Sequence, residues 1–256
     1  MDKVLNRDRL VVLGALAAVV ALAWAYLAYI VLAQPAMDMD AIAMAAMPPP
    51  VWDVRYFTAT LAMWMVMMVG MMLPSAAPTV LLFDALQMHG DAGLRHRRAT
   101  ALFAAGYVLA WAAFGVLATS AQWALSESML LSAMMTGRSP VFIGSLLVIA
   151  GTYQFTRWKT ACLSQCRSPA GFLVRHRRRG ALGPLLMGLR HGVQCIGCCW
   201  ALMALLFAFG VMNLVWVAAL AVFVFVEKLT PAGALVGRIG GFLMIGAGLT
   251  MMAIGV

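Results

Sequence analysis

Five cysteines and one histidine of this 256-residue sequence form two short clusters, and such grouping indicates chemistry rather than packing. The clusters are Cys162 with Cys166, and His191 with Cys195, Cys198 and Cys199. Thiolate and imidazole groups together are good ligands for Cu(I) and Zn²⁺. Neighbouring thiols can also form and break a disulfide, so a thiol redox relay and plain buried cysteines stay open as alternatives.

Helical spacing would align the second cluster on one face. If residues 191–203 are helical, His191, Cys195 and Cys199 repeat every four residues, and Met203 continues the row. The first cluster has the same spacing, and the basic segment that contains it is long enough to fold it back toward the second. The sequence leaves open whether the two clusters meet.

Methionine is unusually frequent, with 21 residues, and its positions suggest soft-metal chemistry. One row lies at i, i+4 and i+8 of an apolar stretch, and a second row adjoins it. The rows are Met63, Met67 and Met71, and Met65, Met68 and Met72. At about 1.5 Å per residue this ladder would extend ~13 Å along a helix. Thioethers suit Cu(I) and bind harder cations poorly, although methionine also fills irregular cores.

A proline-rich segment, 34–56, precedes this stretch and carries further methionines beside carboxylates. They are Met37, Met39, Met44 and Met47. Methionine exposed on a loop has no core to fill, so we expect these thioethers to capture a soft metal outside the membrane.

Glu227 and Lys228 end another apolar stretch, near its inner boundary. Ionisable residues at such depth are commonly functional, but a lysine can also extend its ammonium to the interface. Adjacent helical residues point about 100° apart, so the two are not expected to pair. We interpret Glu227 as an interfacial anchor, with a proton carrier or a partner of His191 as alternatives. The remaining histidines stand beside charged loops and are expected at the surface: His89, His96 and His176.

The elements that position these groups must be membrane-spanning helices. Hydrophobic residues make up 64% of the sequence and charged residues 11%, and the mean hydropathy is +0.93. A soluble domain has about 25% charged residues, so a soluble globular protein is excluded. The expected fold class is all-α, a polytopic transmembrane helix bundle, because helices satisfy their own backbone hydrogen bonds in lipid.

Seven apolar stretches approach the ~20 residues that a spanning helix needs. They are 10–33, 57–82, 100–120, 140–157, 191–210, 212–229 and 235–255. With the N-terminus inside, 16 of the 18 Lys and Arg residues fall on the inner side. The positive-inside rule therefore predicts the N-terminus inside, the C-terminus outside and an inner (cytoplasmic) membrane location. The first stretch is longer than a usual signal-peptide core, which favours a retained helix over a cleaved one.

The net charge of +9 is explained by this topology and by contact with anionic lipid, and no nucleic-acid partner is expected. Residues 1–256 form one integral membrane domain, with an outer Met/Pro-rich loop at 34–56 and an inner basic loop at 158–190. Pro74 and Pro78 are expected to kink the methionine-rich helix and to free two carbonyls. No phosphate-binding loop, dinucleotide fingerprint or nucleophile elbow is present in the sequence.

A row of small residues enters the last apolar stretch: Gly233, Gly237 and Gly241. Such rows let helix backbones approach closely. We expect this row to pack within the bundle, with a homo-oligomer seam as the alternative.

Several motifs coincide in this chain: Met71-Met72-Leu73-Pro74-Ser75, Cys162-x-x-x-Cys166-Arg167-x-Pro169, Cys195-x-x-Cys198-Cys199-Trp200, Gly210-Val211-Met212-Asn213-Leu214 and Glu227-Lys228. Together they resemble a bacterial family of predicted metal-binding integral membrane proteins of unestablished function, some of which are labelled copper chaperone. The resemblance covers most of the chain beyond the outer loop. It implies that the methionines of 63–72, both cysteine clusters, His191 and Glu227 matter to the family, and it supplies no reaction.

The sequence therefore predicts an integral membrane protein that binds Cu(I), with Zn²⁺ as the alternative metal, and relays or delivers it. The loop methionines would capture the ion, the methionine ladder would carry it to mid-membrane, and the Cys and His ligands would hold it on the inner side. Thiolate is the stronger ligand, which favours inward movement, although outward delivery to a membrane enzyme would use the same residues. A copper donor or acceptor protein and the lipid bilayer are the expected partners.

Two alternatives belong to other classes. One is a membrane thiol-disulfide oxidoreductase that uses the cysteine clusters, and the other is a non-catalytic subunit of a larger membrane complex. No catalytic residue is predicted, and a role other than enzyme is favoured.

Overall fold

The computed structural model describes residues 2–33, 51–88, 94–132, 135–178 and 180–255, and the regular elements within them are all helices. The helices are α1 (Asp2–Leu32), α3 (Val54–Met88), α4 (Leu94–Glu127), α5 (Pro140–Tyr153), α6 (Arg157–Arg167), α7 (Pro169–Arg175), α8 (Gly183–Ala204), α9 (Leu206–Phe209), α10 (Leu214–Leu229) and α11 (Gly233–Ile254). The all-α class is therefore confirmed.

Five helical segments in the described residues are long and apolar enough to cross a membrane. They are Leu10–Leu32, Val54–Gln87, Arg95–Glu127, Gly183–Phe209 and Gly233–Ile254. The other two predicted stretches also fold as helices, but α5 has 14 residues and α10 has 16, fewer than the ~20 that span a bilayer. Seven spans thus remain a prediction, and so does the orientation of the bundle.

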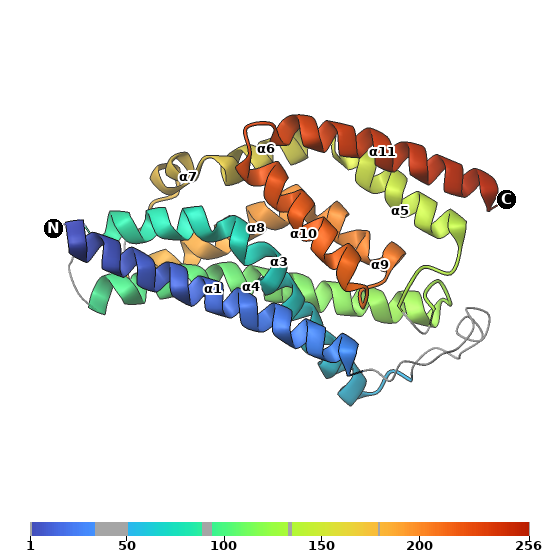
Figure 1. Ribbon diagram of the computed structural model, residues 1–256, viewed down its shortest axis with the longest axis horizontal. Helices are drawn as coiled ribbons and strands as arrows, with labels where there is room; N and C mark the ends of the chain where they lie inside the picture. The colour runs from blue at the N-terminus through green and yellow to red at the C-terminus, as the bar shows by residue number, and fades with distance from the viewer. Residues whose placement is uncertain (1, 34–50, 89–93, 133–134, 179, 256) are drawn as a thin grey trace.

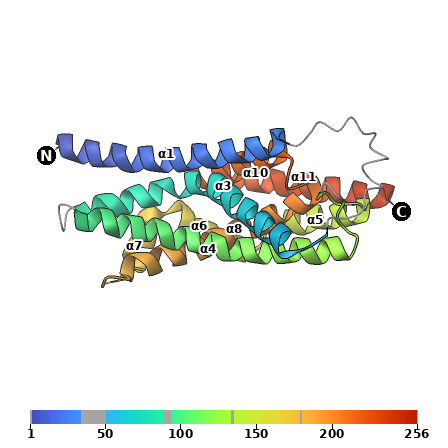
Figure 2. The same ribbon diagram turned by 90° about the horizontal axis from the view of Figure 1, so that it is seen from below.

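The helices lie mostly along one long axis, with the two ends of the chain at opposite ends of the molecule (Figure 1). Helix α1 covers one face and packs on α3, while α4 lies between α3 and α8 (Figure 2). Helices α5 and α11 pack on each other at the C-terminal end. Opposite ends fit an odd number of passes along this axis.

Helix α3 continues through both of its prolines and changes direction in its middle part (Figures 1 and 2). Pro74 has no N–H for the carbonyl of Gly70. Trp24 of α1 donates its Nε1–H to that carbonyl at 3.3 Å. The expected kink is therefore present, and the freed carbonyl has a hydrogen-bond partner on the neighbouring helix, as polar backbone groups away from water require.

Two glycines let α4 and α8 touch backbone to backbone. A Cβ on Gly106 would overlap the carbonyl of Leu185, and a Cβ on Gly188 would overlap that of Phe103. Close approach of this kind is the usual role of small residues in membrane helices. It brings α8 against α4, so that the side chains of α8 can enter a core shared with α3.

The small-residue row of α11 is covered by this chain's own residues. A Cβ on Gly233 would overlap the carbonyl of Glu227, and one on Gly241 would lie 2.9 Å from Cβ of Gln154. The row is buried in the described structure. It packs α11 against the end of α10 and against α5.

The surface placement of His96 is wrong. This residue lies in the first turn of α4 and is 4% exposed. Helix α4 begins at Leu94, earlier than the apolar stretch suggested, and its first turns pack on the end of α3. There Thr100 donates a hydrogen bond to the buried carboxylate of Asp84 at 2.7 Å.

Candidate metal-binding core

Helix α8 carries three cysteines into the interior of the bundle. Cys195, Cys198 and Cys199 are each 1–2% exposed, and the predicted helical register is the observed one. The thiols of Cys198 and Cys199 both donate to the carbonyl of Cys195, at 3.0 Å each. The chain's five cysteines all lie within the described residues, and all are free thiols.

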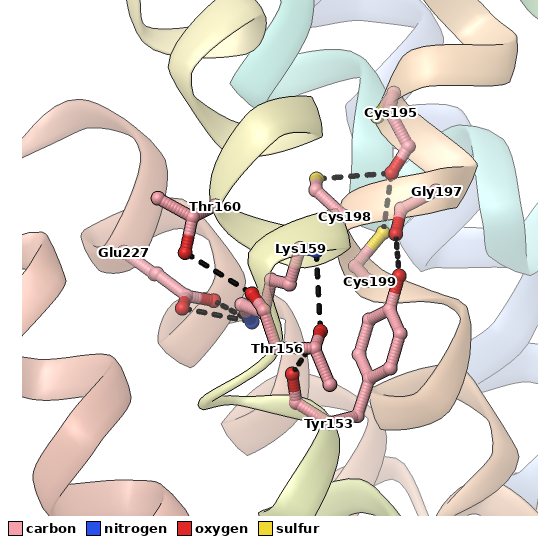
Figure 3. Close-up of polar contacts among 9 residues, drawn as sticks. All are labelled: Tyr153, Thr156, Lys159, Thr160, Cys195, Gly197, Cys198, Cys199 and Glu227. Atoms are coloured by element: carbon pink, nitrogen blue, oxygen red, sulfur yellow. Dashed lines mark hydrogen bonds and ion pairs between the residues drawn. The ribbon is translucent and has the colours of Figure 1, made fainter.

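Helix α6 folds back onto this row. Its N-cap is Thr156, whose hydroxyl accepts a hydrogen bond from the backbone N–H of Lys159 at 3.2 Å, and the helix lies across α8 in Figure 3. Cys166 lies close to Cys195 and Cys198, and its interaction with these two groups, together with burial, raises the pKa of the Cys166 thiol. The two cysteine clusters therefore meet in one place.

Gly197 makes room for the other cysteine of α6. A Cβ on this glycine would lie 2.8 Å from Sγ of Cys162. Burial raises the pKa of the half-buried Cys162 thiol. Tyr153 of α5 donates its hydroxyl hydrogen to the Gly197 carbonyl, so three helices meet at this residue (Figure 3).

The methionine ladder of α3 ends at the cysteine row. Met63, Met67, Met68, Met71 and Met72 are all at most 5% exposed and share one hydrophobic core with the three cysteines of α8. Sδ of Met72 lies 4.0 Å from Sγ of Cys199. Met65 is only half-buried, facing Gly115 of α4. At one end of the ladder, a thioether therefore faces a thiol.

Two polar groups from other helices reach Cys195. Lys228 of α10 donates from Nζ to Sγ of Cys195 at 2.9 Å and to Oγ of Ser75 at 3.3 Å. The Tyr107 hydroxyl lies 3.0 Å from the same sulfur and 3.1 Å from the carbonyl oxygen of Met72. Sequence reasoning found no signal for Tyr107, and it assigned Ser75 no role of its own beyond its place at the end of the motif Met71-Met72-Leu73-Pro74-Ser75. It noticed Lys228 but expected the ammonium at the interface, whereas the side chain is 3% exposed.

Glu227, the neighbour of Lys228, points elsewhere. Its carboxylate forms an ion pair with Lys159 of α6 at 2.8 Å, and both side chains are 3% exposed (Figure 3). A Cβ on Gly237 would lie 2.5 Å from Oε1 of Glu227, so this glycine accommodates the carboxylate. The expected separation of Glu227 from Lys228 is observed, and the partner of Glu227 is Lys159 rather than His191.

His191 lies one turn before Cys195 in an aromatic environment. Its ring centroid is 4.9 Å from that of Phe172, 5.6 Å from that of Tyr107 and 6.2 Å from that of Phe103. The residue is 2% exposed, and its Nδ1 has no hydrogen-bond partner in the described structure. The helical row places His191 beside the sulfur core, but its neighbours are rings.

The four loop methionines, Met37, Met39, Met44 and Met47, lie outside the described residues. Within the described part of the chain, no group of three or more His, Cys, Asp and Glu side chains is arranged to hold a metal ion. Thioethers are not among these four residue types. The sulfur groups that do meet are a thioether of α3 and thiols of α8 and α6.

Fold and core together define a helical membrane-type bundle with a buried, sulfur-rich centre. Residues 61–251 match the PpoB2 family, described as copper chaperone, and the chain belongs to this family. The family resemblance stated from the sequence motifs is therefore confirmed. Neither the curated proteins nor the solved structures contain a significant match to the chain.

Proposed function

We propose that this protein binds Cu(I) in its sulfur core and passes the ion between the thioethers of α3 and the thiols of α8 and α6. The observation that carries the proposal is the 4.0 Å separation of Met72 Sδ and Cys199 Sγ. Transfer of an ion requires that donor and acceptor ligands touch, and here the last thioether of the ladder touches the first thiol. The family's copper chaperone description supports copper as the cargo.

The ligand types favour Cu(I) over Zn²⁺. Structural zinc sites are closed by four Cys, His or carboxylate ligands, whereas the contact between α3 and α8 joins a thioether to a thiol. Thioether and thiolate are soft ligands that select Cu(I). Met72 therefore adds to a copper site and contributes little to a zinc site.

The order of ligands gives the relay a direction. Thioethers of α3 lead to Cys199, and Cys166 and Cys162 of α6 follow next to the row on α8. Thiolate binds Cu(I) more strongly than thioether does, so the gradient draws the ion from the ladder toward the cysteines. We propose that Met37, Met39, Met44 and Met47 load the ladder from outside, with the N-terminus inside and the basic segments facing the cytoplasm.

Metal content after Cu(I) loading tests the proposal. The protein is purified in detergent without oxygen or chelator, and copper per chain is counted by mass spectrometry. We expect about one copper or more in the wild type, a marked loss in Cys195→Ser/Cys199→Ser, and weakened binding in Met72→Leu. Met251→Leu, a substitution at a partly exposed position of α11, serves as the matched control and should bind as the wild type does. Zinc in place of copper would contradict the proposal.

One observation favours a second candidate, a thiol-disulfide oxidoreductase. Cys166 lies close to Cys195 and Cys198, and all three are free thiols. In that case the purified protein would bind no copper, and Cys166 would form a reversible disulfide with one of the cysteines of α8. The Met72→Leu variant would then retain the activity of the wild type.

A further inference from the structure

Lys228 is a buried cation whose charge no carboxylate neutralises in the described structure. Its ammonium donates to Ser75 and to Cys195, a hydroxyl and a sulfur. The nearest acidic side chain in the sequence, Glu227, is held in an ion pair by Lys159. Tyr107, the other group at Cys195, is a hydroxyl. Of the two groups that accept hydrogen bonds from this ammonium, the sulfur of Cys195 is the one that can acquire a compensating negative charge.

The position of Lys228 is fixed from both sides of the core. Ser75, which accepts one of its hydrogen bonds, donates its own hydrogen to the carbonyl of Met72 at 2.8 Å. Cys195, which accepts the other, lies one turn before Cys199 on α8. The ammonium thus bridges α3 and α8 at the point where the thioether ladder meets the cysteines.

We propose that Lys228 makes the sulfur core selective for a monovalent cation. This inference rests on the proposed function. A metal binds cysteine as thiolate. Two thiolates, from Cys195 and Cys199, with the neutral thioether of Met72, carry two negative charges. A monovalent ion leaves one negative charge, which the ammonium of Lys228 cancels, whereas a divalent ion leaves the site with one uncompensated positive charge.

The interior of the bundle makes this difference large. A net charge buried away from water costs much free energy unless it is paired, and Coulomb energies are several-fold greater at low dielectric than in water. The pair formed by Lys159 and Glu227 contributes no net charge. Lys228 therefore acts as a positioning residue that sets charge selectivity without binding the metal itself.

Relative affinities test the inference. The reduced protein in detergent is titrated with Ag(I), a monovalent soft ion without accessible redox chemistry, and separately with Cd²⁺, a divalent thiophile. We expect the wild type to prefer Ag(I), and Lys228→Met to lower the ratio of Ag(I) affinity to Cd²⁺ affinity roughly tenfold or more. Lys228→Arg keeps the charge and should keep a ratio near that of the wild type. A ratio of affinities is insensitive to partial loss of folded protein.

A second variant cancels the charge and leaves Lys228 in place. Ser75→Asp puts a carboxylate where the serine hydroxyl now lies 3.3 Å from Nζ, and it should lower the ratio in the same direction as Lys228→Met. An unchanged ratio in both variants, or an equal fall in both affinities, would overturn the inference and leave Lys228 as a structural residue. A wild type that binds neither Ag(I) nor Cu(I) would instead overturn the proposed function.

Discussion

Two buried lysines, Lys159 of α6 and Lys228 of α10, differ in how their charge is compensated. Both side chains are 2–3% exposed. Lys159 is matched by the carboxylate of Glu227 at 2.8 Å, whereas Lys228 faces a hydroxyl and a cysteine sulfur. A complete ion pair is neutral and joins α6 to α10. The charge of an ammonium beside a thiol is compensated only when that thiol becomes a thiolate, as it does on binding metal.

Removal of one partner of the complete pair should have the largest effect on stability. Glu227→Gln leaves the ammonium of Lys159 buried without a counter-charge, which is expected to cost about 3–5 kcal/mol. Unfolding of the detergent-solubilised protein by increasing denaturing detergent gives the change in free energy. Glu127→Gln, at the exposed end of α4, is the matched control and should change stability little. Equal stability of the two variants would show that the pair is not a structural link.

Loss of the tyrosine hydroxyl at Cys195 should have a smaller effect. Tyr107→Phe removes the group 3.1 Å from the carbonyl of Met72 and is expected to cost about 1–2 kcal/mol. Because the hydroxyl is neutral, the ratio of Ag(I) to Cd²⁺ affinity should stay near that of the wild type. The same denaturant titration and metal titrations check both statements. If the affinity ratio of Tyr107→Phe fell as low as that of Lys228→Met, loss of a neutral hydrogen bond at this sulfur would have the same effect as loss of the charge.

Replacement of both members of the complete pair should have the smallest effect. Lys159→Met with Glu227→Met removes two opposite charges together, and such exchanges are often close to neutral in stability. We expect the double variant to recover most of the stability lost in Glu227→Gln and to bind copper as the wild type does. Copper content and the unfolding free energy are compared side by side. A double variant without copper would mean that the pair contributes to metal binding and not only to the fold.

The sequence predicts which residues share one face of a helix better than it predicts which helices are in contact. The spacing of Cys195 and Cys199 correctly predicts a buried row on α8. The apolar stretches correctly predict helices. Helix ends were less predictable, because α3 and α4 extend beyond their apolar stretches into polar sequence.

Contacts across the core depend on residues far apart in the chain. The spacing of Cys162 and Cys166 does not predict that α6 packs on α8. The need for a glycine at position 197 is likewise evident only from the structure, where Cys162 lies beside it. The direction of Lys228 follows from α10 ending against α3 and α8, which no local pattern encodes. The contact of Tyr107 is also non-local, since its hydroxyl reaches Cys195 only because α4 packs on α8.

The central claim is that Cu(I) lies among sulfur ligands where α3 meets α8. X-ray absorption at the copper edge of the anaerobically loaded protein, compared with Met72→Leu and Cys199→Ser, tests it most directly. The account predicts monovalent copper with only sulfur neighbours in the wild type, and fewer sulfur neighbours in each variant. A shell containing nitrogen, or an identical sulfur shell in all three proteins, would contradict it, because copper would then lie at His191 or away from the contact between Met72 and Cys199.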